Sequence, residues 1–453
     1  MMSKLLPGAL CLSALFFASA HAAEKPNILV ILGDDLGQRD LGCYGSDLYR
    51  TPHLDRLASQ GTRFTRAYTA AHVCSPTRAS LLTGKFPARL HLTDWLTGHV
   101  KPHAKLRIPE WATELPQSEV TLAEMLKPSG YATAWLGKWH LGQGAPDHGF
   151  DAGNQSWELN RKKDEDDPKG VFTLTKEAIE FIDQNKERPF FLSVSHYAPH
   201  GPVRFNEKLK DEYQATVDAK NPRQSNAGYA AMIEAFDTSI GQLLEALDQR
   251  KLTDNTLVLF LSDNGGELNF TNNTPLREGK GTLYEGGVRI PLIARWPGKI
   301  PAGQVSDTVI CSVDLFPTFA AVAGGSLPQN IDGVNITDVL SGKKKELDRT
   351  LCWHYPHYHR EKPSGSILKG DWKLIEWFES GKTELFRLDQ DPYEQNDLAE
   401  KEPQRAAELL GELNRWRKDV GAQMPTPNPD YDPETADLTE QQLKKKQAKA
   451  EKR

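Results

Sequence analysis

Two pairs of oxygen-bearing side chains, Asp34-Asp35 and Asp263-Asn264, each follow directly after a short apolar run. Three carboxylates and an amide oxygen are hard ligands that suit Ca²⁺ better than Zn²⁺, which prefers histidine or cysteine. An alternative for the first pair is capping of a helix that follows a strand. Because adjacent acids facing another acid repel one another without a cation, we favour one divalent ion held by all four residues.

Cys74 lies in the string Cys-Ser-Pro-Thr-Arg, with Arg78 one helical turn later. A proline is typical of the first turn of a helix, so the cysteine is expected at a helix N-terminus, where free N–H groups favour an anion. This position alone leaves open a buried or reactive thiol without a catalytic role. The cysteines at Cys43, Cys311 and Cys352 are expected to be small buried apolar residues.

The apolar runs before these residues predict a parallel sheet covered by helices on both faces. Continuous apolar runs, typical of strands buried on both faces, occupy residues 28–32, 131–136, 190–194 and 257–261. Helical patterns between them occupy residues 121–127, 174–185 and 229–247. In open α/β sheets the ligand site lies at the carboxyl ends of the strands, so the polar clusters are expected to converge.

The pattern changes near residue 348. Short antiparallel strands are predicted over residues 351–355, 366–368, 372–378 and 384–388, followed by an amphipathic helix over 403–420. We therefore expect a catalytic α/β domain at 23–347 and a smaller α+β subdomain at 348–424, with an antiparallel sheet and one helix. Residues 425–453 are Pro-rich and then Lys-rich, which predicts a poorly ordered tail, with binding of an anionic polymer as the alternative.

The N-terminal segment at 1–22 reads as a signal peptide. A lysine at position 4 precedes an apolar run at 9–18 and the small-residue pattern Ala20-His21-Ala22. The run is shorter than the about 20 residues that span a bilayer, so we expect export to the periplasm or outside the cell and no integral membrane segment. The net charge of -6 argues against a dedicated nucleic-acid binder.

The string CSPTRASLLTG at 74–84 resembles the signature of type I, formylglycine-dependent sulfatases. Other stretches similar to motifs of that family lie in the family's order around it, at Asp34-Asp35, Gly137–Gly142, His196–His200, Asp263–Gly266 and Gly279–Arg289. The resemblance covers roughly residues 25–399 and is to secreted bacterial carbohydrate sulfatases and arylsulfatase A-like proteins of the alkaline phosphatase superfamily. It implies a large, mostly parallel sheet sandwiched by helices.

The resemblance implies that Cys74 is oxidised to Cα-formylglycine by a formylglycine-generating or anaerobic sulfatase-maturating enzyme. One Ca²⁺ is then expected to bind Asp34, Asp35, Asp263, Asn264 and an oxygen at position 74. The aldehyde hydrate attacks sulfur and forms a covalent sulfoenzyme intermediate.

Five further catalytic roles follow from the same resemblance. His200 is expected to protonate the departing alcohol oxygen, and His140 to remove a proton from the remaining hydroxyl. Arg78 holds the hydrate, while Lys138 and Lys280 neutralise the sulfate oxygens. The alternatives are that the histidines are core residues and that the lysines form surface salt bridges.

The expected substrate is a sulfated glycan of galactose or N-acetylgalactosamine type, attacked in an exo manner. Stretches rich in sugar-binding residue types lie at 39–40, 91–103 and 353–359. From them we select Asp94, His354 and His357 as substrate-binding candidates, beside Lys138, His200 and Lys280. Alternatively, the aromatic residues of the last stretch pack in the core of the smaller subdomain and do not bind the sugar. Competing functions are an arylsulfatase of broad specificity, a phosphonate monoester hydrolase and a binding module without activity.

Overall fold

The computed structural model describes residues 25–154, 157–161 and 163–450. The predicted signal peptide at 1–22 lies outside the described residues. Over the described ranges, no helix combines the length and the hydropathy that crossing a membrane requires.

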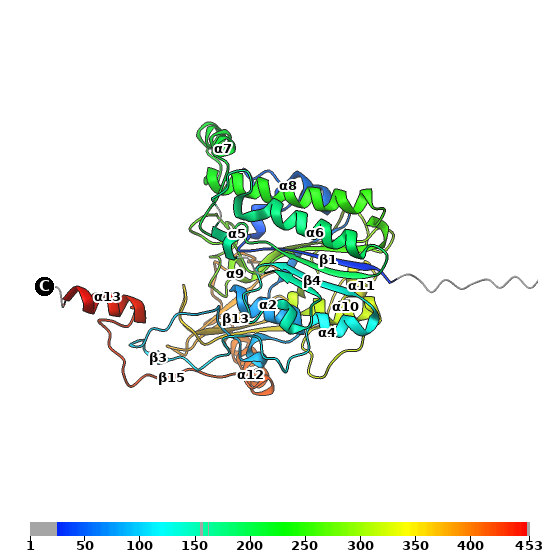
Figure 1. Ribbon diagram of the computed structural model, residues 1–453. Coiled ribbons are helices and arrows are strands. Elements are labelled where there is room, and N and C mark those ends of the chain that lie inside the picture. Colours follow the sequence, from blue (N-terminus) through cyan, green and yellow to red (C-terminus); the bar gives the residue numbers. More distant parts are fainter. Residues whose placement is uncertain (1–24, 155–156, 162, 451–453) are drawn as a thin grey trace, which may run out of the picture.

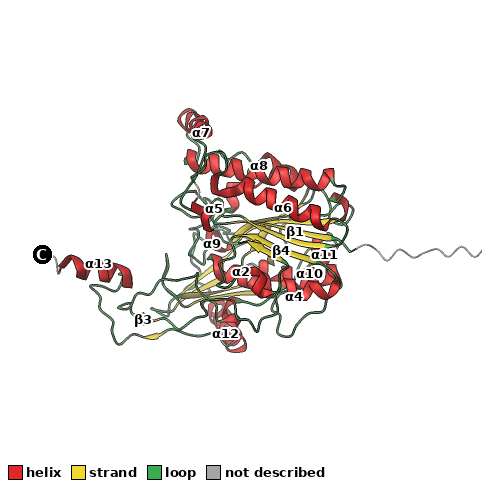
Figure 2. Ribbon diagram, viewed as in Figure 1, coloured by secondary structure: helices red, strands yellow, loops and turns green. Residues whose placement is uncertain are grey.

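A nine-stranded sheet forms the centre of the molecule (Figures 1 and 2). Its order is β10 (Ile310–Cys311), β2 (Thr62–Tyr68), β8 (Arg289–Arg295), β7 (Thr256–Ser262), β1 (Asn27–Gly33), β6 (Phe190–Ser195), β4 (Ala132–Gly137) and β5 (Ala152–Asn154), with β9 (Gln304–Ser306) beside β2. Neighbouring strands are parallel except at β8, which runs antiparallel to β7 and β2. The mostly parallel sheet and its four predicted strands are thereby confirmed.

Helices cover both faces of this sheet (Figure 2). One face carries α1 (Pro52–Ser59), α6 (Val171–Asn185) and α8 (Ala227–Gln249), with α7 (Glu207–Lys220) packed on α8. The other carries α2 (Cys74–Thr83), α4 (Leu122–Leu126) and α10 (Leu315–Ala323). Alternate residues of β1 supply the two cores: Leu29 and Ile31 pack on the first face, and Val30 and Leu32 on the second. The short helices are α3 (Pro87–Leu90), α5 (Trp157–Arg161), α9 (Glu285–Val288) and α11 (Thr337–Leu340).

The register of four adjacent strands brings the polar residues to one edge. In the order β7, β1, β6 and β4, the strand ends are paired, so that Gly33 lies opposite Ser262 and Ser195 lies opposite Gly137. The next residue after each strand therefore leaves the sheet at the same edge. The expected convergence of the polar clusters is confirmed.

The C-terminal subdomain is an antiparallel sheet with one helix, as predicted. Its strands are β11 (Thr350–Tyr355), β12 (Ser364–Lys369), β13 (Trp372–Trp377) and β14 (Thr383–Arg387). Helix α12 (Pro403–Val420) packs Leu409 and Leu413 against Ile367 and Leu374 of this sheet.

The tail differs from its prediction. Within the predicted poorly ordered segment, β15 (Thr426–Pro427) pairs with β3 (Leu106–Arg107), and α13 (Glu440–Ala450) follows. The Asn428 side chain donates to the carbonyls of Pro102 and Ala104 at 2.8 and 2.7 Å. Composition predicts disorder because the segment buries little apolar surface, whereas backbone pairing with a loop far earlier in the chain leaves no local signal.

A buried charge cluster joins the subdomain to the catalytic domain. The Lys373 ammonium of β13 lies 2.9 Å from Glu285 of α9 and 2.8 Å from Glu394, and all three side chains are fully buried. Burial raises the pKa of Glu394 to about 7, against the opposing effect of Lys373. Glu394 therefore depends on this lysine for neutralisation, whereas Glu285 also lies 3.4 Å from Arg289.

We expect Lys373→Met to lower the free energy of unfolding by about 3–5 kcal/mol, because it leaves buried carboxylates without their shared partner. The exposed Lys382 of the same subdomain provides the control, and Lys382→Met should change stability by less than about 0.5 kcal/mol. Urea unfolding of both variants measures the difference. Equal losses would show that the cluster contributes nothing to the junction.

Candidate active site

Three carboxylates meet three cations where the strands end. Lys138 Nζ lies 2.8 and 2.7 Å from the two oxygens of Asp34, and Lys280 Nζ lies 2.7 Å from Asp35. Arg78 Nη2 lies 2.7 Å from Asp263. All six side chains are buried. The structure thus brings together the acids and the cations predicted from separate motifs.

Arg78 ties these strand ends together. Its Nη2 is also 3.7 Å from Asp34, so the carboxylates after β1 and β7 share one nitrogen. Its Nη1 donates to the Lys138 carbonyl at 2.8 Å and to the Ser195 hydroxyl. One guanidinium thus contacts groups at the ends of four strands and links their positions.

The mutual effects of these charges appear in the pKa values. Burial opposes ionisation of Asp35, but Lys280 and His200 hold its pKa below the usual range. Burial and the adjacent Asp34 carboxylate raise the pKa of Asp263. Burial also disfavours the charged form of Lys138, yet Asp34 raises its pKa above the usual value. Crowded carboxylates of this kind favour a bound cation.

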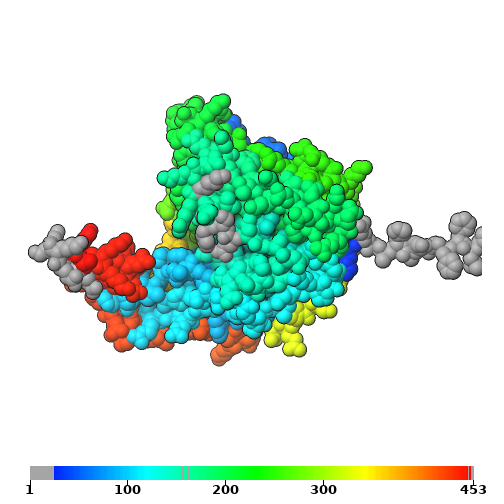
Figure 3. Space-filling model, viewed as in Figure 1, coloured from blue at the N-terminus to red at the C-terminus, as the bar shows by residue number. Residues whose placement is uncertain are grey.

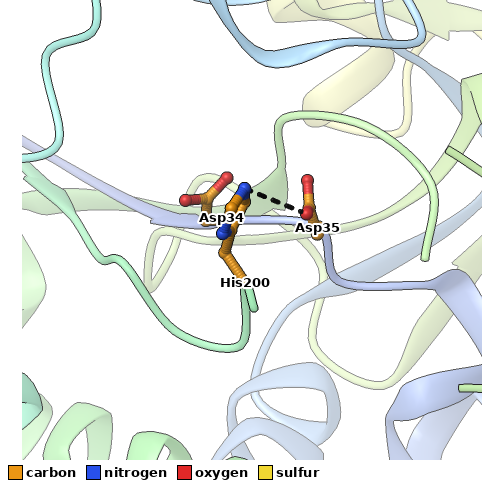
Figure 4. Close-up of side chains that lie close together, drawn as sticks. All are labelled: Asp34, Asp35 and His200. Atoms are coloured by element: carbon orange, nitrogen blue, oxygen red, sulfur yellow. Dashed lines mark ion pairs between the residues drawn. The ribbon is translucent and has the colours of Figure 1, made fainter. Parts of the chain in front are cut away.

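His200 approaches the acids from the loop after β6 (Figure 4). Its Nε2 lies 3.6 Å from Asp35, and ligand atoms of Asp34, Asp35 and His200 all lie within 4.8 Å of one another. Its Nδ1 lies 2.5 Å from the Gly201 carbonyl, which only accepts, so Nδ1 carries a proton. Burial, together with Lys138 and Lys280, lowers the pKa of His200 to about 3.

Asn264 provides a test of whether a cation fits. Its Nδ2 donates to Asp35 at 2.9 Å, while its Oδ1 is buried and has no hydrogen-bond partner within the described part of the chain. A buried acceptor without a donor is costly, and a hard cation is one way to satisfy it. The donor set at these residues therefore fits an oxygen-ligated divalent ion.

Cys74 is the first residue of α2, as predicted, and is buried. Its Sγ lies 3.1 Å from Nδ1 of His140, whose Nε2 lies 2.7 Å from the Leu96 carbonyl. Because a carbonyl only accepts, Nε2 carries the proton and the Nδ1 lone pair faces position 74. Burial, with Lys138 and Arg78, lowers the pKa of His140 to about 3, so this histidine is a neutral acceptor at neutral pH.

A cavity of about 780 Å³ opens at this point. Five predicted site residues, Cys74, Lys138, His140, His200 and Lys280, line it. The remaining wall residues come from loops and short elements: Trp95, Leu96, Thr97, Thr113, Gly142, Asn160, Arg161, Glu267 and His359. The cavity therefore unites the chemistry with side chains suited to bind a polar molecule.

Three predicted substrate contacts lie elsewhere. Asp94 is fully buried and accepts from the Trp95 backbone and the Tyr355 hydroxyl. His357 is fully buried 2.7 Å from the Thr93 hydroxyl, and His354 lies 2.8 Å from the Gln423 carbonyl. Asp94 and His357 thus bond residues of the loop that supplies Trp95, Leu96 and Thr97 to the cavity wall. None of the three lines the cavity, and their contact with substrate stays a prediction. Neither motif nor composition shows which side chains of a loop face inward.

Sequence reasoning misses several wall residues. His359 belongs to the stretch at 353–359 but is not among the selected candidates; it lies in the loop after β11, where strand alternation does not indicate which side chains face the cavity. Glu267 directly follows the Asp263–Gly266 motif, which is a usable signal. Leu96 acts through its backbone carbonyl, so its residue type carries no signal.

Comparisons with known proteins agree with this geometry. The family model described as Sulfatase matches residues 26–325, and that described as N-sulphoglucosamine sulphohydrolase, C-terminal, matches residues 279–419. A protein named Sulfatase from Formosa agariphila is 32% identical, covering 91% of this chain and 92% of the relative. The chain belongs to the sulfatase family. Human N-acetylgalactosamine-6-sulfatase is 34% identical, covering 82% of this sulfatase and 75% of the human protein.

Solved structures show the same architecture. The crystal structure of Ps i-CgsB in complex with k-i-k-neocarrahexaose is 29% identical, with a TM-score of 0.74, and covers 90% of this sulfatase and 95% of that chain. The phosphonate monoester hydrolase of Agrobacterium radiobacter, at 19% identity, a TM-score of 0.67 and coverage of 87% and 96%, shares the fold alone. Since the sequence relatives are named sulfatases, the protein is a sulfuric ester hydrolase.

Proposed function

We propose that this sulfatase hydrolyses sulfate esters of a glycan by means of formylglycine made from Cys74. The observation that carries the proposal is the position of Cys74: it starts α2, lines the cavity and faces the unprotonated Nδ1 of His140 at 3.1 Å. A maturating enzyme of the formylglycine-generating or anaerobic type oxidises the thiol-bearing carbon to an aldehyde. In water the aldehyde supplies a hydrate, whose hydroxyl is a nucleophile toward sulfur.

Asp34, Asp35, Asp263 and Asn264 are proposed to hold one Ca²⁺. Three carboxylate groups and the unsatisfied Asn264 oxygen form a hard donor set of the kind that Ca²⁺ prefers. When bound, the ion supplies positive charge that lowers the pKa of a hydroxyl and attracts a sulfate oxygen. His200 lies near the first two ligands, but its proposed role is proton transfer.

The two histidines are proposed to handle protons at opposite sides of the reaction. His140 Nδ1 accepts a proton from the group at position 74, because its Nε2 is committed to the Leu96 carbonyl. His200 Nε2 gives a proton to the departing alcohol oxygen. The low pKa of His200 makes its neutral form dominant here, and the negative charge of a bound sulfate ester favours its protonation.

Lys138 and Lys280 are proposed to bind the sulfate oxygens. Both ammonium groups belong to residues that line the cavity, and each already lies 2.7 Å from a carboxylate. Carboxylates raise the pKa of both lysines above the usual value, so each stays charged throughout the reaction. Two fixed cations stabilise charge that is spread over the transferring group.

A glycan substrate is supported by the cavity and by the relatives. A volume of about 780 Å³ lies within the range of about 300–1,000 Å³ typical of small-molecule sites. Its wall offers Trp95 for contact with a sugar ring, and His359, Asn160 and Glu267 for hydroxyl groups. One relative is named N-acetylgalactosamine-6-sulfatase and one solved structure holds k-i-k-neocarrahexaose, and we propose galactose- or N-acetylgalactosamine-type sugars, attacked in an exo manner. Such substrates agree with export to the periplasm or the medium.

We expect active protein to carry formylglycine at position 74, visible by peptide mass spectrometry as loss of the thiol. Cys74→Ala should abolish turnover while leaving the melting temperature close to that of the parent, because the side chain is small and buried. Cys352→Ala, another buried cysteine, is the matched control and should retain turnover. Full activity in Cys74→Ala would rule out the covalent mechanism.

Asp263→Asn should raise the dissociation constant for Ca²⁺ by at least about tenfold, since calcium affinity depends on ligand charge. Turnover at limiting calcium should fall with it. Titration calorimetry on chelator-treated protein measures the affinity. Asp237→Asn, a buried acid that accepts from the α1 backbone, controls for general loss of stability. Unchanged calcium affinity in Asp263→Asn would contradict the proposed ligand set.

His359→Ala should lower kcat/KM on the best glycan sulfate by about tenfold, because a sugar hydroxyl loses a hydrogen-bond partner. The assay uses monosaccharide and oligosaccharide sulfates that differ in ring and position, with an aryl sulfate and an aryl phosphonate for comparison. His53→Ala on α1 is the control. An aryl ester preferred by orders of magnitude, with His359→Ala fully active on every sugar, would exclude the glycan assignment.

A further inference from the structure

Helix α13 presents an unbalanced row of positive charge. Its eleven residues include Lys444, Lys445, Lys446 and Lys449, all exposed, against the single acid Glu440. Only Lys444 pairs with that acid, at 2.7 Å. The whole chain has a net charge of -6, so its net charge does not attract a polyanion. The positive charge of α13 therefore contrasts with the negative net charge of the whole chain.

The segment before α13 is fixed to a loop of the catalytic domain. Besides the β15–β3 pairing, the Asp432 amide donates to the His103 carbonyl at 3.2 Å, and the Glu440 amide donates to the Val100 carbonyl at 3.1 Å. His103 and Thr435 also bond through their side chains at 2.6 Å. The first turn of α13 is thus attached at a defined place (Figure 3, red residues against cyan-blue).

Two acids of this segment are paired with cations of that loop. Asp430 lies 2.9 Å from Arg107, and Asp437 lies 3.4 Å from Lys101. Asp432 is hydrogen-bonded within its own turn, and Lys446 is among the groups that lower its pKa. Lys445, Lys446 and Lys449 are exposed, and within the described part of the chain no carboxylate lies within ion-pair distance of them.

The same loop leads to the active site. Residues 95–97, which line the cavity, lie only three positions before Val100, where α13 is attached. His359, which also lines the cavity, is followed by Arg360, which pairs with Glu267, and by Lys362, which pairs with Glu379. In Figure 1, α13 lies beyond the edge of the sheet near which α5 and α9 lie. The loop that supplies part of the cavity wall is therefore the loop to which α13 is attached.

We propose that α13 binds a sulfated polysaccharide outside the cavity, so that its lysines hold sulfate groups of a chain whose end enters the active site. This inference rests on the proposed function, because it supplies a second contact for the same glycan. Single exposed ion contacts are weak, but several on one polymer act together. Such contacts distinguish a polymer from a monosaccharide and weaken with added salt.

The test compares a variant with Lys444, Lys445, Lys446 and Lys449 all changed to Gln with a control of equal charge change. The control carries Lys176→Gln, Lys186→Gln, Lys208→Gln and Lys220→Gln, which lie on or beside α6 and α7. Binding of dextran sulfate is measured in the Cys74→Ala background, with unsulfated dextran and phosphatidylglycerol vesicles as comparison probes. Turnover of a sulfated oligosaccharide series and of its monosaccharide sulfate is measured with Cys74 intact.

We expect the α13 variant to bind dextran sulfate about tenfold more weakly at low salt, with a shallower salt dependence. Its kcat/KM should fall on long chains and stay unchanged on the monosaccharide. Equal binding by variant and parent, equal loss in the control, or tighter binding to the vesicles than to dextran sulfate would overturn the inference. Failure of the parent to hydrolyse any glycan sulfate contradicts the proposed function instead, and the binding comparison remains decisive for α13.

Discussion

Three carboxylates and three cations share a buried space at the carboxyl edge of the sheet, and the rest of the site depends on that arrangement. In a low-dielectric interior an unpaired charge is costly, so each group is held by its partners. Strand order places Asp34 and Asp263 on neighbouring strands, and Arg78 of α2 reaches both. The same contact fixes the start of α2, and with it Cys74. Electrostatics and backbone topology therefore specify one geometry together.

Two site residues adopt backbone conformations that ordinary side chains avoid. Asp35 has φ 63° and His140 has φ 60°, in the left-handed region. Such positions cost of order 1–3 kcal/mol and persist only where surrounding contacts require them. At Asp35 the turn separates two consecutive acids, so that Asp34 meets Lys138 while Asp35 meets Lys280. At His140 it accompanies a ring whose two nitrogens contact Cys74 and the Leu96 carbonyl.

The sequence predicts the sheet and the charged cluster because both leave local signals. Buried strands are continuous apolar runs, and α12 begins and ends where its amphipathic pattern does. Parallel strands bring their carboxyl ends together, which is enough to group Asp34, Lys138, His200 and Asp263. Loop side chains follow no regular period, so the sequence does not show which of them face the cavity. His357 is therefore selected as a substrate contact, whereas the structure shows that His359 lines the cavity and His357 is buried. The pairing of β15 with β3 depends on backbone N–H and C=O groups. Every residue type except proline carries both groups, so residue types do not reveal this pairing.

The pairing of β15 with β3 also constrains when the mouth of the cavity takes shape. Its partners lie far apart in the sequence, so closing that contact costs more chain entropy than any neighbouring strand pair in the core. During synthesis the sheet, α2 and the charged cluster can assemble while the segment from Thr426 onward is still missing. The loop that carries β3 can take its final position only when the C-terminal segment is present. We therefore expect a nascent or truncated chain to form the charged cluster at the strand ends while the loop at the cavity mouth is not yet fixed.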